Sequence, residues 1–252
     1  MEVHAHSSPA PGGAHTPRKK WTHYFWEFLM LFLAVFCGFL AENIREHEIE
    51  HRREKQFMQS LLSDIREDTT EINKSIKNAL KSNQYQDSLI FYLYNHPPVD
   101  FLPVNVSAKL ALYALTRLNI TFNEVTAQQL KNAGNLRLIR KQDIIRKISL
   151  FWNEQENVKI NLDRFLIYRN RGREFEEKLY SYSDYDLVEA GLIAPPEKGV
   201  RIITSDHALW SEFANIISHC RITTKQYIAK LQNQLIMSID LIQLLQKEYH
   251  LK

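Results

Sequence analysis

Residues 21–41 read WTHYFWEFLMLFLAVFCGFLA and continue into a charged, proline-free segment that begins at Glu42. A helix of about 21 residues extends about 31 Å, which matches the hydrocarbon core of a bilayer. Its uninterrupted apolar part, residues 28–41, is shorter, and that length alone also suits a buried helix or the core of a signal peptide. We interpret residues 21–41 as one transmembrane helix followed by a water-soluble domain.

The residues around the span support this interpretation. Basic residues 18–20 precede it, and aromatic rings cluster in its first turns, where a membrane interface favours them. The side chains that we expect to anchor the chain in lipid are Trp21, Tyr24, Trp26, Phe28, Leu31, Phe36 and Leu40. The first predicted partner is therefore a lipid bilayer that the chain crosses once.

A cleaved signal peptide is the main alternative for this segment. Cleavage needs small residues just before the cut, and bulky Phe39 occupies such a position before Glu42. Phe36 likewise argues against lipid attachment at Cys37. We expect the anchor to be retained.

The orientation of the span depends on the basic residues that flank it. Three precede it, and four (Arg45, Arg52, Arg53 and Lys55) follow soon after, so the count is nearly balanced. A short basic tail lies directly against the span, and a long domain can translocate whatever its charge. We therefore expect a single-pass protein of the inner (cytoplasmic) membrane with its N-terminus inside and its soluble domain in the periplasm.

Helix breakers are scarce and clustered after the span. The prolines there are Pro97, Pro98, Pro103, Pro195 and Pro196, and the glycines are Gly134, Gly172, Gly191 and Gly199. This composition predicts an all-α chain in which a single transmembrane helix continues into an elongated antiparallel helical bundle. The predicted regions are a disordered basic tail (1–20), the transmembrane helix (21–41), a charged helical stalk (42–57) and the bundle domain (58–252).

The first helix is expected to continue from the span to about residue 94. Between residues 58 and 79 its apolar positions alternate in steps of four and three, at Met58, Leu62, Ile65, Thr69, Ile72, Ile76 and Ala79. Such a stripe must be buried, either in a dimeric coiled coil or within the chain's own bundle. We favour the bundle, because two later helices offer stripes of similar length.

Four further helices are predicted downstream. They cover residues 106–117, residues 124–133 with Gly134 as the stop, residues 141–170, and a final long helix capped by Asp206. Residues 119–123 form a connector, and residues 180–204 form a loop or a small irregular lobe. The expected core residues of the two long helices are Ile144, Ile148, Phe151, Trp152, Val158, Leu162, Phe165 and Ile167, then Leu209, Phe213, Ile216, Cys220, Tyr227, Leu231, Leu235, Ile239, Leu241 and Leu245.

Few residues point to a chemistry. The sequence has no glycine-rich phosphate loop, nucleophile elbow or zinc-protease signature, so we predict no catalytic residue, no cofactor and no metal. His47 and His51 are spaced to share a metal on one helix face, but without a third ligand we expect a solvated stalk. A net charge of +3 is too small to indicate nucleic acid.

Tyrosines in the predicted loop are the one candidate for a contact surface. Tyr180, Tyr182 and Tyr185 alternate with serines and acids, and tyrosine is favoured where one side of a contact is wet. Asp184, Asp186 and Glu189 in the same loop are candidates for acid–base chemistry in an enzyme with an unrecognised site.

Two stretches resemble a known family. FLMLFLAVFCGFLAENIREH followed by EKQFMQSLLSDIREDTTEI, and TFNEVTAQQLKNAGNLRLIRKQDIIRKISLFW, are similar to an uncharacterised family of bacterial inner-membrane proteins with one N-terminal span. The second stretch matches that family's Leu-x-x-x-Gly-Asn-Leu-x-x-Ile turn. The resemblance implies the anchor and a helical soluble domain, and no activity.

The sequence thus favours a membrane-anchored, non-enzymatic helical module that binds an unknown protein partner or forms a homo-oligomer. The alternative is a small-molecule-sensing helical domain that is coupled to the membrane. A third possibility is a hydrolase with a novel site.

Overall fold

The computed structural model describes residues 21–95, 101–102, 110, 112–132, 134–181 and 200–252. The predicted tail, residues 1–20, lies outside the described residues. The chain divides into two compact units, residues 1–52 and residues 53–252, so that the second begins five residues before the predicted start of the bundle domain.

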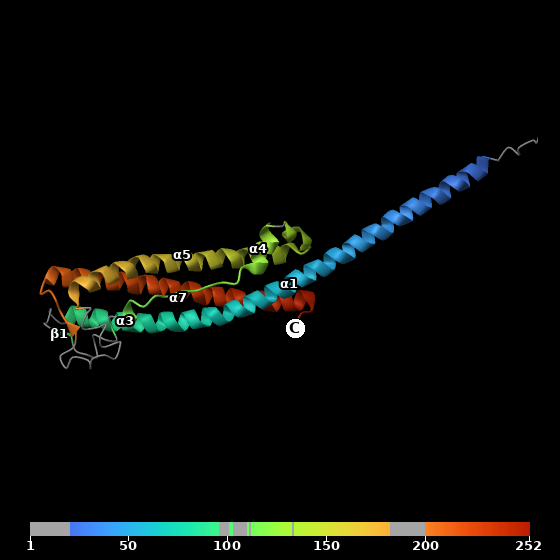
Figure 1. Ribbon diagram of the computed structural model, residues 1–252. Coiled ribbons are helices and arrows are strands. Elements are labelled where there is room, and N and C mark those ends of the chain that lie inside the picture. The colour runs from blue at the N-terminus through green and yellow to red at the C-terminus, as the bar shows by residue number, and fades with distance from the viewer. Residues whose placement is uncertain (1–20, 96–100, 103–109, 111, 133, 182–199) are drawn as a thin grey trace, which may run out of the picture. The chain divides into compact units, whose positions relative to one another are not determined.

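The first long helix, α1 (Trp21–Asn95), is 75 residues long (Figure 1). Its length follows from the sequence, which holds no proline and only Gly38 between these bounds. Pro97 and Pro98 follow directly, and proline disfavours the helical conformation in the residue before it. The prediction of one helix from the span to about residue 94 is confirmed.

Three long helices form the second unit: α1 from residue 53 onward, α5 (Gln142–Leu179) and α7 (His207–Tyr249). They lie side by side, with α7 running antiparallel to α1 (Figure 1). At one end Tyr249 binds Glu54, and at the other the indole N–H of Trp210 donates to the carbonyl of Leu93 at 3.1 Å. The all-α helical bundle is confirmed, and α7 runs antiparallel to α1 within it.

Two of the three helices nevertheless run parallel. The backbone N–H just before α5, at Arg140, donates to Glu54, and Gln155 donates to Asp68 farther along, so α1 and α5 advance together. Parallel helices need a long return connection between them. The return connection, residues 114–124, follows α1 back along its length (Figure 1).

The return connection is extended, which lets few residues cover a long helix. The carbonyl of Ala114 accepts from Gln86 at 2.9 Å, and the backbone N–H of Asn123 donates to Asp68 at 2.7 Å. Extended chain rises about 3.3 Å per residue against about 1.5 Å in a helix, so this short segment matches about twice as many residues of α1.

Short elements complete the unit. They are the strands β1 (Phe101–Leu102) and β2 (Val200–Arg201), which pair antiparallel, and the helices α3 (Leu112–Ala114), α4 (Val125–Asn132) and η2 (Asn135–Leu138), the last a 3-10 helix. Gly134, with φ of +63°, lies between α4 and η2, as a stop for the predicted helix requires. The final helix is capped as predicted, since Asp206 accepts from the N–H of Ala208 at 2.8 Å.

The predicted helix over residues 106–117 is confirmed at residues 112–114 and wrong at residues 115–117, which are not helical. Most of its first half lies outside the described residues, and α3 ends at Ala114. The carbonyls that would continue the helix are bound by other elements: Gln86 donates to Ala114, and the guanidinium of Arg169 donates to Leu115 at 2.9 Å. These contacts hold the chain extended.

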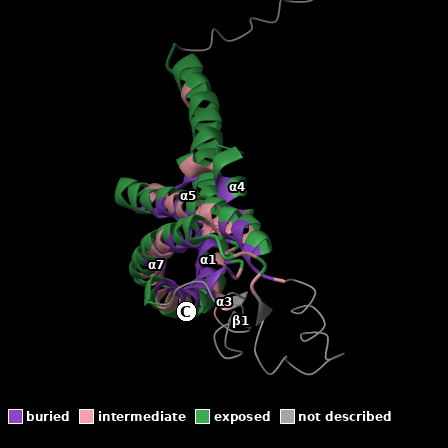
Figure 2. Cartoon of the chain, turned by 90° about the vertical axis from the view of Figure 1, so that its left-hand side faces the viewer, coloured by how far each residue is buried: buried purple, intermediate pink, exposed green. Residues whose placement is uncertain are grey.

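The core is a row of three apolar clusters between α1, α5 and α7. One includes Met58, Ile65 and Ile144, the middle one Ile72 and Tyr227, and the last Leu89 and Phe213. Figure 2 shows buried residues on the inner faces of the three helices. Of the predicted α1 stripe, Thr69 and Ile76 are half-buried, and the other five side chains are fully buried against their own chain.

Two predicted core residues are exposed. Ile167 is 66% exposed and Ile239 is 45% exposed. Each lies one or two positions from a residue that is buried, Phe165 and Ser238, and each residue turns a helix by about 100°. The register of the bundle, rather than hydrophobicity alone, decides which side chain points inward.

Candidate functional site

The first candidate site is the exposed apolar part of α1. In residues 21–52 every side chain is exposed except that of Leu29, which is half-buried. The predicted anchor residues Trp21, Tyr24, Trp26, Phe28, Leu31, Phe36 and Leu40 are all exposed, from 80% for Trp21 to 45% for Leu40. Among the described residues one helix, α1, is long and apolar enough to cross a membrane. A helix that is apolar on all sides is stable where lipid or protein surrounds it.

Aromatic rings form a continuous face on this segment. Phe28, Phe32 and Phe36 follow one another at intervals of four, with ring centroids 6.2 and 5.9 Å apart. Four-residue spacing places side chains on the same face of a helix. The one acid of the segment, Glu27, lies 3.2 Å from His23 near its start. The apolar part beyond Glu27 is therefore uninterrupted by charge up to Glu42.

The second candidate is a buried acid where the bundle begins. Glu54 is 3% exposed, although the sequence places it in a charged stalk. Its carboxylate accepts from the hydroxyl of Tyr249 at 2.6 Å and from the backbone N–H of Arg140 at 3.1 Å. The predicted solvated stalk, residues 42–57, is thus wrong at Glu54, because donors from two distant segments replace water around this carboxylate.

A third candidate is a buried polar layer in the middle of the bundle. Asp68 is 2% exposed, and its carboxylate accepts from the backbone N–H of Asn123 at 2.7 Å and from the side-chain amide of Gln155 at 2.9 Å. Burial is the main cause that raises the pKa of Asp68 to about 6, and the neighbouring carboxylates of Asp64 and Glu67 raise this pKa as well. The hydrogen bonds from Asn123 and Gln155 act in the opposite direction and lower it. This side chain joins α1, the return connection and α5.

The neighbouring acids of α1 hold the start of α4. Asp64 accepts from the backbone N–H of Thr126 at 3.1 Å, and Glu67 accepts from the side-chain amide of Asn123 at 2.9 Å. The first N–H groups of a helix have no partner within it, and carboxylates satisfy them well. These acids therefore position α4. Among the described residues there is no group of three or more His, Cys, Asp or Glu that could hold a metal ion.

Gln234 belongs to the same level of the bundle. Its neighbour Asn233 donates to Glu154 at 2.9 Å, and Glu154 precedes Gln155, the partner of Asp68. Gln234 is 0% exposed, and within the described part of the chain neither atom of its amide has a hydrogen-bond partner. Leaving such a group buried without a partner costs about 1–3 kcal/mol.

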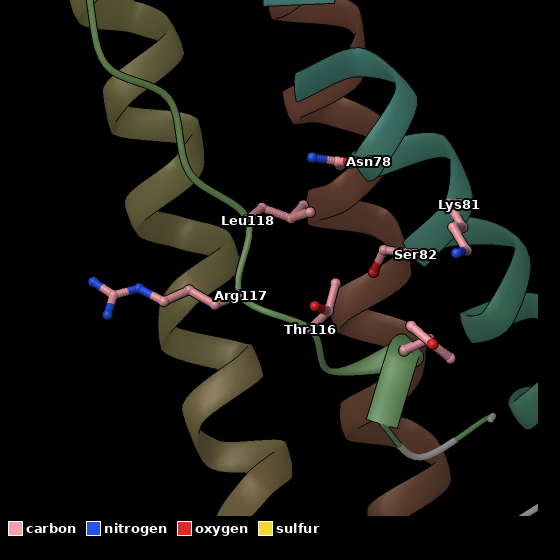
Figure 3. A pocket seen from close by; sticks show the side chains of 7 residues that line it. Asn78, Lys81, Ser82, Thr116, Arg117 and Leu118 are labelled. Carbon is pink, nitrogen blue, oxygen red and sulfur yellow. The ribbon is translucent and has the colours of Figure 1, made fainter. Parts of the chain in front are cut away.

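A small cleft of about 210 Å³ lies beside the return connection. Its lining comprises Asn78, Lys81, Ser82, Tyr113, Thr116, Arg117 and Leu118, shown in Figure 3. The Ser82 hydroxyl donates to the Ala114 carbonyl at 3.3 Å, and the Lys81 ammonium lies 4.8 Å from the Tyr113 ring centre. The lining offers cations, hydroxyls and amides without a carboxylate or an imidazole, so these seven residues supply no general acid–base pair of the usual kind.

The predicted tyrosine surface does not include Tyr180 in this structure. Tyr180 is 5% exposed, and its ring packs edge-on against Phe213 at 6.0 Å between centroids. Burial raises the pKa of its phenol well above the usual value. Tyr182 and Tyr185 lie outside the described residues, and the contact surface there stays a prediction. Asp184, Asp186 and Glu189 also lie outside the described residues.

Cys220 is the one cysteine of the bundle, and it is buried. Burial raises the pKa of its thiol to about 12, so the thiol stays protonated at neutral pH. Because the thiolate is the reactive form, Cys220 is a packing residue of the core.

Sequence reasoning missed the buried polar residues of α1. Asp68 and Ser75 occupy the core where the apolar pattern points to Thr69 and Ile76. A signal existed, because a spacing of three and four from Ile65 also reaches Asp68, Ile72 and Ser75. In both cases the neighbouring residue is more hydrophobic, so the pattern predicted Thr69 instead of Asp68 and Ile76 instead of Ser75 as the core residue.

No protein-family model matches the chain, and no curated protein or solved structure is significantly similar to it. The resemblance to a family of inner-membrane proteins therefore stays a prediction. The fold and the exposed segment define an all-α protein whose longest helix includes one candidate membrane span.

Proposed function

We propose that this protein is a membrane-anchored, non-enzymatic helical module that binds a partner protein or a second copy of itself. One observation carries the proposal: α1 contains the exposed apolar segment and is also one of the long helices of the bundle. An anchor and a core helix in one continuous element keep the folded unit at the membrane without a separate linker domain. The proposal includes the inner membrane, an N-terminus inside and a periplasmic bundle.

Exposed isoleucines support an interaction role. On α5, Ile160 and Ile167 are 52% and 66% exposed and lie seven residues apart, on one face. Ile222 and Ile236 on α7 are also exposed. Burying one such side chain in an interface contributes about 1.5–3 kcal/mol, so the α5 pair is sufficient to matter for a partner.

Ligand sensing is supported less well. The cleft beside Ser82 is about 210 Å³, below the 300–1,000 Å³ that is typical of pockets for drug-sized ligands. The small volume favours a contact surface over a ligand site at this place. Two other clefts, of about 350 and 430 Å³, reach that range but are open and lined mainly by polar residues, whereas such ligand pockets are mostly apolar.

The anchor is tested by washing membranes that contain the full chain with alkaline carbonate. We expect the chain to stay in the membrane pellet, and a variant that lacks residues 1–41 to be soluble. Recovery of the full chain in the wash would contradict the proposal. Paired reporters fused after Lys252, one active outside the cytoplasm and one fluorescent inside, test the proposed orientation.

The interaction is tested with a photo-crosslinking residue at Arg164, which is exposed between Ile160 and Ile167. We expect a discrete crosslinked species in intact membranes that is lost in Ile167→Glu. Leu80→Glu, the same change at an exposed apolar residue of α1, is the matched control and should leave it intact. A species that survives Ile167→Glu would exclude this face.

A further inference from the structure

The two ends of the bundle differ in charge. The described part of the end at which α1 enters consists of residues 53–60, 129–132, 134–147 and 244–252, which meet through the contacts of Glu54 with Arg140 and Tyr249. These segments hold ten lysines and arginines against three carboxylates. Two of those carboxylates are already engaged: Glu54 is buried, and Glu248 pairs with Lys141.

The described part of the opposite end has the reverse balance. Residues 85–95, 168–181 and 202–215 hold four lysines and arginines and six carboxylates. The basic character is therefore a property of one end, whereas the chain as a whole carries a net charge of only +3. Such a local excess creates a positive field at that end.

Two clefts open at the basic end, beside α1. One, of about 430 Å³, is lined by Leu62 and Leu251 and by polar residues of α1 and the last residues of the sequence, namely Lys55, Gln59, Ser63, Arg66, His250 and Lys252. The guanidinium of Arg66 already donates to the backbone oxygen of Lys252 at 3.0 Å. The other, of about 350 Å³, includes Arg53, Gln56 and Asn135. No carboxylate side chain is among the described residues that line either cleft. Ammonium, guanidinium and amide groups are the donors that bind phosphate oxygens.

The basic end is also the one closest along the chain to the span. Residues 42–52 separate the span from Arg53, and in the helical conformation of α1 these eleven residues are about 16 Å long. The headgroup layer of a bilayer takes up about 5–7 Å of that length. The remaining length of chain, about 10 Å, is comparable with the Debye length at physiological salt, so this connection is short enough to keep Arg53 within the electrostatic reach of the headgroups whatever angle the bundle adopts.

We propose that the basic end of the bundle, residues 53–60, 129–132, 134–147 and 244–252, binds the phosphates of anionic phospholipids in the bilayer that holds the span. This inference rests on the proposed membrane anchor and adds a lipid specificity to it. The apolar part of the span beyond Glu27 carries no charge that could select a headgroup, whereas the clefts beside Lys55 and Arg53 select a negative one.

The experiment uses the full chain in lipid nanodiscs with a photo-crosslinking residue at Gln142, an exposed position among the basic residues. The discs contain phosphatidylcholine alone or with phosphatidylglycerol, and mass spectrometry measures the lipid adduct per chain. We expect about fivefold more adduct with the anionic lipid. The excess should disappear at about 1 M salt, where the Debye length is about 3 Å.

A charge variant identifies the residues. Replacing Arg137, Arg146 and Lys147 by glutamine should reduce the adduct severalfold. The matched control replaces Lys74, Lys77 and Lys225, exposed residues of α1 and α7 between the ends, and should leave it unchanged. Equal adduct in both lipids, or an equal loss in both variants, overturns the inference while leaving the anchor in place. A full chain that fails to enter the discs overturns the anchor and this inference together.

Discussion

The hydroxyl of Tyr249 donates a hydrogen bond of 2.6 Å to Oε1 of Glu54, 195 positions earlier in the chain. The backbone N–H of Arg140 donates to the same oxygen at 3.1 Å. Burial and the adjacent carboxylate raise the pKa of Tyr249, so the phenol keeps its proton and remains a donor. One oxygen atom therefore joins the entry of α1, the segment before α5 and the last turn of α7.

We expect Tyr249→Phe to destabilise the bundle, because it removes this donor and keeps the ring. A hydrogen bond to a charged group contributes about 1.5–3 kcal/mol, so the free energy of unfolding should fall by that amount. Thermal unfolding of the fragment 42–252, which contains all three core clusters, measures the change.

Tyr94→Phe is the matched control for this prediction. The Tyr94 side chain is 63% exposed, and its hydroxyl lies 3.2 Å from the amide oxygen of Asn215. Surface changes of this kind usually stay within about 0.5 kcal/mol. Equal losses of unfolding free energy in the two variants would show that the buried hydrogen bond to Glu54 stabilises the bundle no more than an exposed one does.

The sequence predicted the long helices because their signals are local. Prolines lie close to both ends of α1, and Asp206 caps the start of α7. In both helices, apolar residues spaced three and four positions apart mark the core face. The exposed span was equally predictable, since length and apolar character alone define it.

The polar sites were not predictable in this way, because their partners are distant in sequence. Glu54 resembles its solvated neighbours until Tyr249 and Arg140 are placed beside it. Likewise, Ser238 lies inside and Ile239 outside because packing fixes the rotation of α7. The parallel course of α1 and α5 depends on an extended connection whose hydrogen bonds come from other elements, so no local pattern indicated it.

Asp68→Asn tests the buried acid through the pH dependence of stability. The pKa of Asp68 is about 6 in the folded chain, raised from 3.8 by burial. Between these pH values the folded form binds more protons, so this group's contribution is complete below pH 3.8 and is lost as the pH rises through 6. The difference between the two pKa values, 3.8 and about 6, corresponds to a change of about 3 kcal/mol at most in the free energy of unfolding.

The asparagine introduced by Asp68→Asn can keep the local contacts, because its oxygen can accept from Asn123 and its amide can donate to a rotated Gln155. We expect the variant to be more stable than the natural chain at pH 7.5 and similar to it at pH 4. Urea unfolding at both pH values measures the difference between the two chains, which removes contributions that they share. A difference that is the same at pH 4 and pH 7.5 would contradict the raised pKa.

Gly172→Ala should destabilise the contact between α5 and the return connection. A Cβ atom at Gly172 would lie 2.8 Å from Cδ2 of Leu115, a side chain that is 0% exposed. Alanine favours a helix by about 1 kcal/mol over glycine, but overpacking typically costs about 1–3 kcal/mol. We expect a net loss of stability in thermal unfolding. Adding Leu115→Val, which shortens the opposing side chain, should recover part of the stability that Gly172→Ala loses. If the double variant loses more stability than the two single variants together, this clash is ruled out.

Gln234→Met should stabilise the bundle, because it replaces a fully buried amide by an apolar side chain of similar length. Neither amide atom of Gln234 has a hydrogen-bond partner among the described residues, and a buried polar group left in that condition costs about 1–3 kcal/mol. Methionine also adapts its shape to an existing space. We expect the melting temperature of the fragment 42–252 to rise by several degrees. Gln232→Met, at an exposed position of the same helix, is the control and should leave it nearly unchanged. A fall in melting temperature for Gln234→Met would instead mean that the amide contributes to the polar layer around Asp68 and Gln155.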